Sequence, residues 1–391
     1  MRQKKWALCL GAFFIAALLS AAPARAESPG QGSGEIPEIL GMTTHRIGSA
    51  SYALATALGE VFKEKTAKKI RVIPIAAEKG RIEMLRKGEA HLSAVPGNIL
   101  YAQEFGLEDY ANREWGVQPL QMAWIGPLYM APVTTKTQKD INSLSDLKGK
   151  RLAMVPNRAG NLIGLSFLAY AGLSFKDIVE VPVPGYTAQF KALISGQVDA
   201  VPFANLTSSV LYEVEASPKG LKWIPVPQGS AEGWKRLRSI APWGFPTKAS
   251  IGPGLSKENR LEALNVGYTI STYEWTSPEL VYLVTKTIGE NIEKLQGMVP
   301  AWKICNMEEA LDIELIPHVY HPGAVRYFKE KGLWTANHQS RNERNLELQQ
   351  RAKEAWAATL KEAKAKDWSA EELRSRWHER QKTITGYTVV E

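Results

Sequence analysis

The stretch RLAMVPNRAGNLIGLSFLAYAGLSFKDIVEVPVPGYTAQFKALISGQVDAVPF, residues 151–203, alternates short apolar runs with longer amphipathic segments. The lengths and spacings predict strands at 151–155, 179–183 and 198–203 and helices at 161–171 and 186–194. Gly172 follows the first of these helices, at a position where a left-handed residue commonly ends a helix. Strands separated by helices favour parallel pairing with right-handed crossovers, so this stretch predicts an α/β sheet.

The part of the chain before this stretch shows the same alternation. We expect strands at 70–73 and 92–95 and helices at 54–62 and 81–87. In both parts one helix ends at a glycine that precedes a strand, at Gly88 and at Gly196. Helix-glycine-strand junctions are common in proteins, so the recurrence is only weak support for a plan of two α/β lobes.

The second half of the chain is less regular. Residues 218–253 are rich in Pro, Gly and Trp and are expected to be irregular, whereas 263–272 is expected to form a strand. The tail is predicted to be helical because an apolar stripe runs along 348–363, and Ser369 with Glu372 forms a capping box pattern. Such a tail packs on its own protein, or alternatively binds a partner.

The first 26 residues have the pattern of a secretory signal peptide. Basic residues come before the apolar run 6–19, and the small-residue pattern Ala24-Arg25-Ala26 predicts cleavage after Ala26. The apolar run is shorter than the ~20 residues that cross a bilayer. The alternative interpretation is an N-terminal membrane anchor. Residues 27–35, rich in Gly and Ser, are expected to be a flexible leader.

The expected mature chain has few features of a metal-binding protein or an enzyme. Cys305 is its only cysteine, which rules out a thiolate cluster within the chain and an internal disulfide. Four of the 48 basic residues lie in the signal peptide, which leaves 44 against 40 acidic residues, a net charge of about +4. Because the charges alternate in sign, nucleic-acid binding is not favoured. We expect a monomeric non-enzyme with no cofactor and no metal.

Four strings carry a likeness to a known family: RIGSASY at 46–52, LKGKR at 147–151, GQVDA at 196–200 and HPGAVRYFKEKG at 321–332. Over residues 38–334 the chain resembles the TAXI family of solute receptors, which serve tripartite ATP-independent periplasmic (TRAP) transporters. The resemblance implies a type II periplasmic binding-protein fold, with two α/β lobes joined by a hinge. It also implies an organic-acid or amino-acid ligand and import driven by an ion gradient.

The turns at 46–52 and 156–161 depart from the Gly, Ser and Thr-rich strings of this family, so ligand identity cannot be transferred. The expected organisation is lobe I at 36–132 and 264–334, lobe II at 133–263, and a helical C-terminal extension at 335–391 packed on lobe I. With two crossings between the lobes, rotation about the crossing segments would close them over a ligand.

Ligands of open α/β sheets bind where strands end and helices begin, and helix N-termini favour anions. Arg46 and Arg158 lie in such turns, one in each lobe, and two guanidinium forks suit a dicarboxylate or an acidic amino acid. Each arginine could instead pair with a surface acid, and the polar residues could instead cap helices or turns. The candidate ligand-binding residues are Thr43, Thr44, Arg46, Ser49, Ser51, Tyr52, Asn98, Tyr129, Asn157, Arg158, Asn161, Tyr186 and Asn205.

The sequence therefore predicts a periplasmic receptor that binds a small organic anion and delivers it to the membrane subunits of a TRAP transporter. Three alternatives remain, namely a receptor of an ATP-driven (ABC) importer, a ligand-presenting partner of a membrane sensor kinase, and a secreted enzyme.

Overall fold

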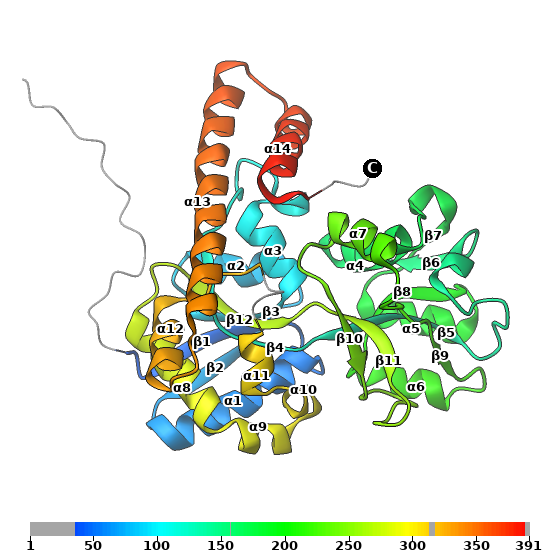
Figure 1. The fold of residues 1–391 in the computed structure, drawn as a ribbon, viewed down its shortest axis with the longest axis horizontal. Coiled ribbons are helices and arrows are strands. Elements are labelled where there is room, and N and C mark those ends of the chain that lie inside the picture. The colour runs from blue at the N-terminus through cyan, green and yellow to red at the C-terminus, as the bar shows by residue number, and fades with distance from the viewer. Residues whose placement is uncertain (1–35, 157, 313–316, 388–391) are drawn as a thin grey trace, which may run out of the picture.

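The computed structural model describes residues 36–156, 158–312 and 317–387. The expected signal peptide and leader lie outside these residues. The described part of the chain forms two α/β lobes side by side, with a long helical hairpin on the first lobe (Figure 1). The expected fold class, two α/β lobes with a helical C-terminal extension, is confirmed.

Lobe I is built on a sheet with strand order β2-β1-β3-β12-β4. Its strands are β1 (Ile39–Thr44), β2 (Lys69–Pro74), β3 (Leu92–Pro96), β4 (Leu120–Gly126) and β12 (Tyr268–Tyr273). β1 pairs in parallel with β2 and β3, whereas β12 runs antiparallel to β3 and β4. The carboxyl ends of β1, β2 and β3 therefore lie at one edge of the sheet.

Helices cover both faces of the lobe I sheet (Figure 1). They are α1 (Ala50–Thr66), α2 (Glu78–Arg86), α3 (Gly97–Phe105), η1 (Glu108–Tyr110), α8 (Pro278–Glu290), α9 (Ile292–Met298), α10 (Pro300–Lys303), α11 (Met307–Leu311) and α12 (Pro322–Glu330). α1 buries Leu54, Leu58 and Val61, which lie on one face of the helix because they recur every three or four residues. The helix expected at 54–62 is thus confirmed.

Lobe II is built on a sheet with order β10-β11-β5-β8-β6-β7, and β9 also pairs with β5. Its strands are β5 (Tyr129–Thr135), β6 (Arg151–Met154), β7 (Val179–Pro182), β8 (Ala200–Asn205), β9 (Leu221–Trp223), β10 (Phe245–Ala249) and β11 (Leu261–Asn265). Its helices are η2 (Leu144–Leu147), α4 (Arg158–Tyr170), η3 (Phe175–Asp177), α5 (Tyr186–Ser195), α6 (Val210–Ala216) and α7 (Ala231–Ile240). The three strands and two helices predicted within 151–203 are confirmed as β6, β7, β8, α4 and α5.

Two expectations about the second half are wrong. Residues 218–253 are not irregular, because they contain β9, α7 and β10. The single strand expected at 263–272 is two strands in different sheets, β11 and β12. Gly267 separates them with a φ of 69°, a left-handed conformation that a strand does not contain.

The chain crosses between the lobes twice, at residues 127–128 and at 266–267. The boundaries expected after residues 132 and 263 fall inside β5 and β11, a few residues from the observed crossings. The side-chain Oδ1 of Asn265 accepts hydrogen bonds from the backbone N–H of Leu128 at 3.0 Å and of Gly267 at 3.1 Å. One side chain therefore ties the two crossing segments together.

The C-terminal extension consists of α13 (Ala336–Ala365) and α14 (Ala370–Thr385). α13 rises along lobe I and beyond it, and α14 returns beside it (Figure 1). The capping box predicted from Ser369 and Glu372 is present at the start of α14. Trp356 and Trp377 pack edge to face at 4.9 Å, which joins the two helices through their buried sides.

Candidate functional site

A cavity of about 320 Å³ opens between the lobes. On the lobe I side it is lined by Arg46, which follows β1. On the lobe II side it is lined by the turn after β7 and the start of α5, at Pro184, Gly185, Thr187, Ala188 and Lys191. Strand ends of the two sheets therefore face one another, which is where open α/β sheets bind ligands.

The turn that follows β1 is held by two serines. Ser49 is the N-cap of α1, and its Oγ accepts a hydrogen bond from the N–H of Tyr52 at 3.2 Å. Ser51 Oγ lies 2.9 Å from Ser49 Oγ and accepts from the N–H of His45 at 3.2 Å. These contacts fix the loop that carries Arg46 and leave the Tyr52 side chain half-buried at the start of α1.

Thr43 and Thr44 are fully buried at the end of β1. The Oγ1 of Thr43 donates to Ser93 Oγ at 2.9 Å, and that of Thr44 donates to the carbonyl of His45 at 2.9 Å. Their described hydrogen bonds are thus made to the protein. Any contact with a ligand stays a prediction for these two residues.

Arg81, on α2, is a charged residue that sequence reasoning placed in a helix but did not select for the site. Its side chain is 2% exposed, and one terminal nitrogen donates to the carbonyls of Ile75 at 2.9 Å and Ala76 at 3.3 Å. Its Nε is buried without a hydrogen-bond partner. Among the described residues, no carboxylate forms an ion pair with it. A buried guanidinium without a counter-charge thus lies beside the carboxyl end of β2.

Arg81 could have been found from helical spacing. Residues 81, 82 and 85 share one face of α2, and that face is buried in the structure. An arginine in line with Ile82 and Leu85 is therefore an arginine directed into the protein, where an unpaired charge is costly.

The electrostatics at this end of lobe I are positive. Burial, together with the neighbouring charges of Arg81 and Arg46, lowers the pKa of His45 to about 4. His45 is therefore neutral at pH 7, while both arginines keep their charge. The turn after β1 therefore lies in a positively charged environment.

Arg46 extends from this turn toward lobe II. One terminal nitrogen of its side chain lies 3.6 Å from the position that a Cβ on Gly185 would occupy. Gly185 is the N-cap of α5 and supplies no side-chain cap, so the first N–H groups of α5 are left for another acceptor. Within the described residues, neither Arg46 nor Lys191 forms an ion pair.

Three other candidates hold turns of lobe II together. Asn161 bonds both backbone groups of Val155, accepting at 3.2 Å and donating at 2.8 Å. The Tyr186 hydroxyl accepts from the N–H of Asn205 at 2.9 Å. Asn205 Oδ1 accepts from both the N–H and the Oγ1 of Thr207. Asn205 ends β8, Tyr186 begins α5 and Asn161 lies in the first turn of α4. Asn161 and Asn205 stabilise their own turns, whereas Tyr186 connects the start of α5 to the end of β8.

The remaining candidates are Asn98, Tyr129, Asn157 and Arg158. Asn98 is buried in the first turn of α3. Tyr129 begins β5 beside a crossing, and its hydroxyl donates to Glu309 Oε1 on α11 at 3.2 Å, so it connects the two lobes. Asn157 lies outside the described residues. Arg158 begins α4, and its side chain lies outside them too.

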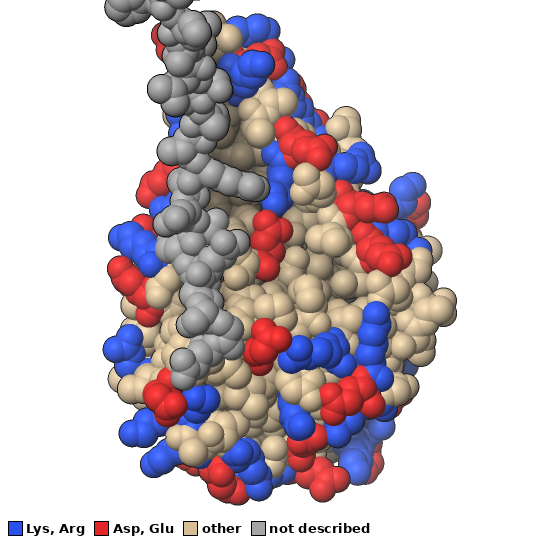
Figure 2. Space-filling view, turned by 90° about the vertical axis from the view of Figure 1, so that its left-hand side faces the viewer, with Lys and Arg blue, Asp and Glu red and all other residues tan. Residues whose placement is uncertain are grey.

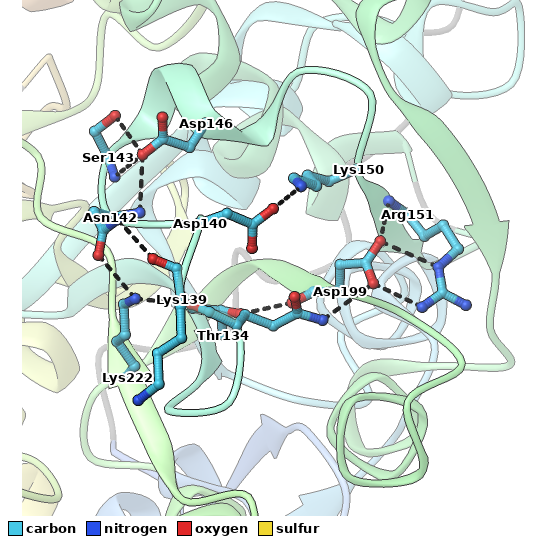
Figure 3. Close-up of polar contacts among 11 residues, drawn as sticks. Thr134, Lys139, Asp140, Asn142, Ser143, Asp146, Lys150, Arg151, Asp199 and Lys222 are labelled. Carbon is cyan, nitrogen blue, oxygen red and sulfur yellow. Dashed lines mark hydrogen bonds and ion pairs between the residues drawn. The ribbon is translucent and has the colours of Figure 1, made fainter.

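Two of the four strings that carry the family likeness, LKGKR and GQVDA, meet at the amino ends of β6 and β8, away from the cavity. Asp199 of GQVDA accepts two hydrogen bonds from the Arg151 guanidinium, at 2.6 and 3.1 Å, and one from its backbone N–H at 2.9 Å (Figure 3). Arg151 closes the LKGKR string. These strings therefore hold the sheet of lobe II together and do not contribute to the cavity.

Two histidines outside the cavity contact other groups of the protein. His318 pairs with Glu104 at 2.6 Å in the core, and His321 caps α12. Within residues 36–156, 158–312 and 317–387, no three His, Cys, Asp or Glu side chains gather as metal ligands would, and no helix is long and apolar enough to cross a membrane. Acidic and basic side chains intermingle over the lobe I face (Figure 2).

Comparison with known proteins finds distant structural likenesses and one family match. Among solved structures, an amino acid ABC transporter substrate-binding protein from Streptococcus pneumoniae, bound to L-arginine, is 15% identical with a TM-score of 0.42, covering 68% of this chain and 95% of that one. PhnD1 from Prochlorococcus marinus, in complex with methylphosphonate, is 11% identical with a TM-score of 0.45, covering 76% and 100%. Likenesses this distant concern the fold alone. The profile of the NMT1-like family matches residues 42–332, more than half of the chain, and the chain belongs to the NMT1-like family.

Proposed function

We propose that this chain is an exported solute receptor that holds a small organic anion between its lobes and delivers it to a membrane transporter. The observation that carries the proposal is the buried guanidinium of Arg81, which has carbonyl partners and, within the described part of the chain, no ion-paired carboxylate. Burying an uncompensated charge costs several kcal/mol. A ligand carboxylate would supply the missing charge and accept two parallel hydrogen bonds from the guanidinium fork.

The proposed class of ligand rests on the positive charges near the turn that follows β1. Arg46 lies on the same turn as His45 and adds a second cation to that of Arg81. A dicarboxylate or an acidic amino acid matches two cations better than a neutral solute does. The candidate residues on the β1 turn would then hold the ligand's oxygen atoms through hydroxyl groups and helix N–H groups.

Two kinds of membrane transporter could receive the ligand from this chain, a TRAP transporter or an ABC importer. The resemblance of residues 321–332 to the TAXI family supports a TRAP transporter driven by an ion gradient. A receptor of an ABC importer has the same two-lobed fold and is the second candidate. Uptake in cells whose ion gradient is collapsed separates the two, because a TRAP system stops while an ATP-driven system continues. Export itself rests on the signal peptide pattern and is checked by finding Glu27 as the mature N-terminus.

The proposal is tested by titrating the mature chain, residues 27–391, with succinate, L-glutamate, L-glutamine and L-arginine in a calorimeter. We expect the two anions to bind and the amide and the cation to bind far more weakly. Arg81→Gln should weaken anion binding by roughly ten- to a hundredfold, since hydrogen bonds to charged groups contribute about 1.5–3 kcal/mol.

Arg71→Gln is the matched control, because Arg71 is an exposed arginine on β2 of the same lobe. The apo melting temperature of each variant separates binding from folding. Arg81→Gln loses two carbonyl contacts but also removes a buried charge, so its stability should change by about 1 kcal/mol or less. If melting temperature and affinity fall together, Arg81 is a structural residue and the anion site is lost as a hypothesis.

A further inference from the structure

Another cavity, of about 400 Å³, lies on lobe I alone, and we call it the α12 groove. Its walls are α12, the first turns of α13, and residues 319–320 beside β4. Both helices lie on the side of lobe I away from lobe II (Figure 1). β4 runs parallel to β1, because β12 is antiparallel to both β3 and β4. The groove therefore lies at the amino end of β4, at the edge of the sheet opposite to Arg46.

The α12 helix, within the string at 321–332, has a buried face and a face in the groove. On the buried face, Gly323 packs so closely on α8 that a Cβ there would come within 2.2 Å of the Pro278 carbonyl oxygen. On the other face, Val325, Arg326 and Lys329 line the groove. Packing on α8 therefore accounts for one half of the string and leaves the groove-facing half to be explained.

Three amide side chains line the groove, and two of them are satisfied by the protein. Gln339 Oε1 accepts from Trp334 Nε1 at 2.9 Å, and both amide atoms of Asn342 bond the backbone of Tyr320, at 2.7 and 3.5 Å. Gln121, on β4, is 5% exposed, and its Oε1 is buried without a hydrogen-bond partner in the part of the chain that the structure describes. Because a buried acceptor is costly to leave unpaired, the groove has a place for a ligand's donor.

The basic side chains of the groove differ in the same way. The Arg326 guanidinium lies 4.2 Å from the ring centroid of Tyr282 and donates to Glu279 Oε1 at 3.1 Å, so α8 already holds it. Lys329 is exposed and, across the described residues, forms no ion pair. An anionic group in the groove would therefore gain a charge-assisted contact with Lys329.

The rest of the wall includes apolar side chains that the protein leaves uncovered. Leu346, on α13, is 43% exposed, and Val325 on α12 is only partly buried. Covering such side chains with the apolar part of a ligand removes them from water. A volume of about 400 Å³ is at the low end of the range for small-molecule sites, roughly 300–1,000 Å³, so the expected ligand is a small molecule.

From these three features we infer that the α12 groove binds an apolar α-amino acid of the size of leucine. The ligand's carboxylate pairs with Lys329, and its side chain covers Val325 and Leu346. Its ammonium group donates to Gln121 Oε1, which turns into the groove about the last side-chain torsion, a soft torsion in glutamine. A dicarboxylate has no donor for Gln121, so this ligand differs from the one proposed for the cavity between the lobes.

Calorimetric titration of the mature chain, residues 27–391, with three related compounds tests the inference. L-leucine carries both charged groups, 4-methylpentanoate lacks the ammonium group, and 3-methylbutylamine lacks the carboxylate. We expect leucine to bind at one site and each of the other two to bind roughly tenfold or more weakly, since each loses a charge-assisted hydrogen bond. Absence of leucine binding, or equal affinity for all three compounds, would overturn the inference.

Substitutions then locate the site. Gln121→Leu removes the unpaired acceptor, so it should weaken leucine binding roughly tenfold or more while the apo melting temperature stays the same or rises. Lys329→Gln should weaken binding to a similar extent without a change in melting temperature. Lys303→Gln is the matched control, because Lys303 is an exposed lysine on α10 of the same lobe and does not line the groove. If both groove variants bind leucine as the wild type does, the groove is not the site.

The inference and the proposed function can fail separately. Arg81→Gln and saturating succinate should leave leucine binding unchanged, because the two cavities lie at opposite edges of the lobe I sheet. If Arg81→Gln weakens leucine binding and the groove variants do not, leucine occupies the cavity between the lobes and the groove inference is wrong. If leucine binds in the groove and no anion binds between the lobes, the groove inference stands and the proposed function fails.

Discussion

At the scale of single residues, two arginines differ in whether the protein supplies a carboxylate partner. Asp199 and Arg151 satisfy one another at the far end of lobe II, and the Arg151 guanidinium holds the pKa of the Asp199 carboxyl below its usual value. Arg81 in lobe I has no such partner. A charged pair that is complete within the protein stabilises the fold, whereas a buried charge that is incomplete suggests a partner from outside. This difference, and not the presence of an arginine, distinguishes a structural residue from a candidate binding residue.

The Asp199 pair gives a prediction about stability. Asp199→Asn should lower the free energy of unfolding by about 1 kcal/mol at pH 7, a value at the low end for charged hydrogen bonds because Arg151 is substantially exposed and water screens the pair. Urea denaturation at pH 7 measures the loss. Glu180→Gln, an exposed acid on β7 of the same sheet, serves as the control and should change stability little.

The difference in free energy of unfolding between the wild type and Asp199→Asn should shrink as the pH falls. Because the folded pKa of Asp199 is lowered, the pair stabilises the protein fully above the unfolded value of about 3.9 and loses its contribution as the pH falls through the folded value. Wild type and Asp199→Asn should therefore converge in stability as the pH decreases below about 4. A difference that persists unchanged at pH 2 would show that the effect does not come from ionisation.

At the scale of elements, α3 lies between the second crossing and the C-terminal hairpin and contacts both. Its first residue, Gly97, lies against the second crossing, where a Cβ would come within 2.2 Å of the Val266 carbonyl oxygen. Its last carbonyls accept hydrogen bonds from α14, with Trp377 Nε1 donating to Gly106 at 2.9 Å and Gln381 Nε2 donating to Phe105 at 2.7 Å. The C-terminal hairpin thus caps the helix whose other end touches the hinge.

Trp377→Phe tests whether the hydrogen bonds from α14 stabilise the carboxyl end of α3. The substitution keeps an aromatic ring but leaves the Gly106 carbonyl without its donor, so we expect a loss of about 1–3 kcal/mol in the free energy of unfolding. Trp368→Phe, at the turn between α13 and α14, is the control and should change stability by less than about 0.5 kcal/mol, because the Trp368 ring is only partly buried. Equal effects of the two substitutions in urea denaturation would contradict a capping role.

The elements that sequence patterns predicted and those that they missed differ for physical reasons. α1 and α5 have clean apolar spacing and were predicted, whereas α7 lies in a segment dominated by Pro, Gly and Trp and was missed although Trp234, Leu237 and Ile240 form its buried face. Arg81 was missed because arginine side chains usually face solvent, although its spacing from Ile82 and Leu85 places it on the buried face of α2. For the candidate site, the β1 turn and Arg46 could be predicted from strand-to-helix order, but the contact of Arg46 with Gly185 depends on how the lobes meet, which local patterns do not contain.

At the scale of the whole molecule, the two lobes are joined at residues 127–128 and 266–267, and these segments run side by side. The N–H of Val266 donates to the carbonyl of Leu128 at 3.0 Å, and the Asn265 side chain accepts from the N–H groups of Leu128 and Gly267. Two crossing segments that are hydrogen-bonded to each other bend together. Rotation of one lobe relative to the other would therefore move both crossings together.

Asn265→Ala should separate the two crossings. Both N–H groups lose their acceptor, so we expect the free energy of unfolding to fall by about 1–3 kcal/mol and the amides of Leu128 and Gly267 to exchange hydrogen faster with solvent. Asn265→Asp keeps an acceptor oxygen at the same position and should retain most of the protection, which makes it the matched control. Hydrogen exchange followed by mass spectrometry over peptides that contain 127–128 and 266–267 measures the effect. If both variants exchange at the wild-type rate, the Asn265 side chain does not hold the crossings together, and the backbone bond from Val266 to Leu128 and the pairing of β5 with β11 are sufficient to do so.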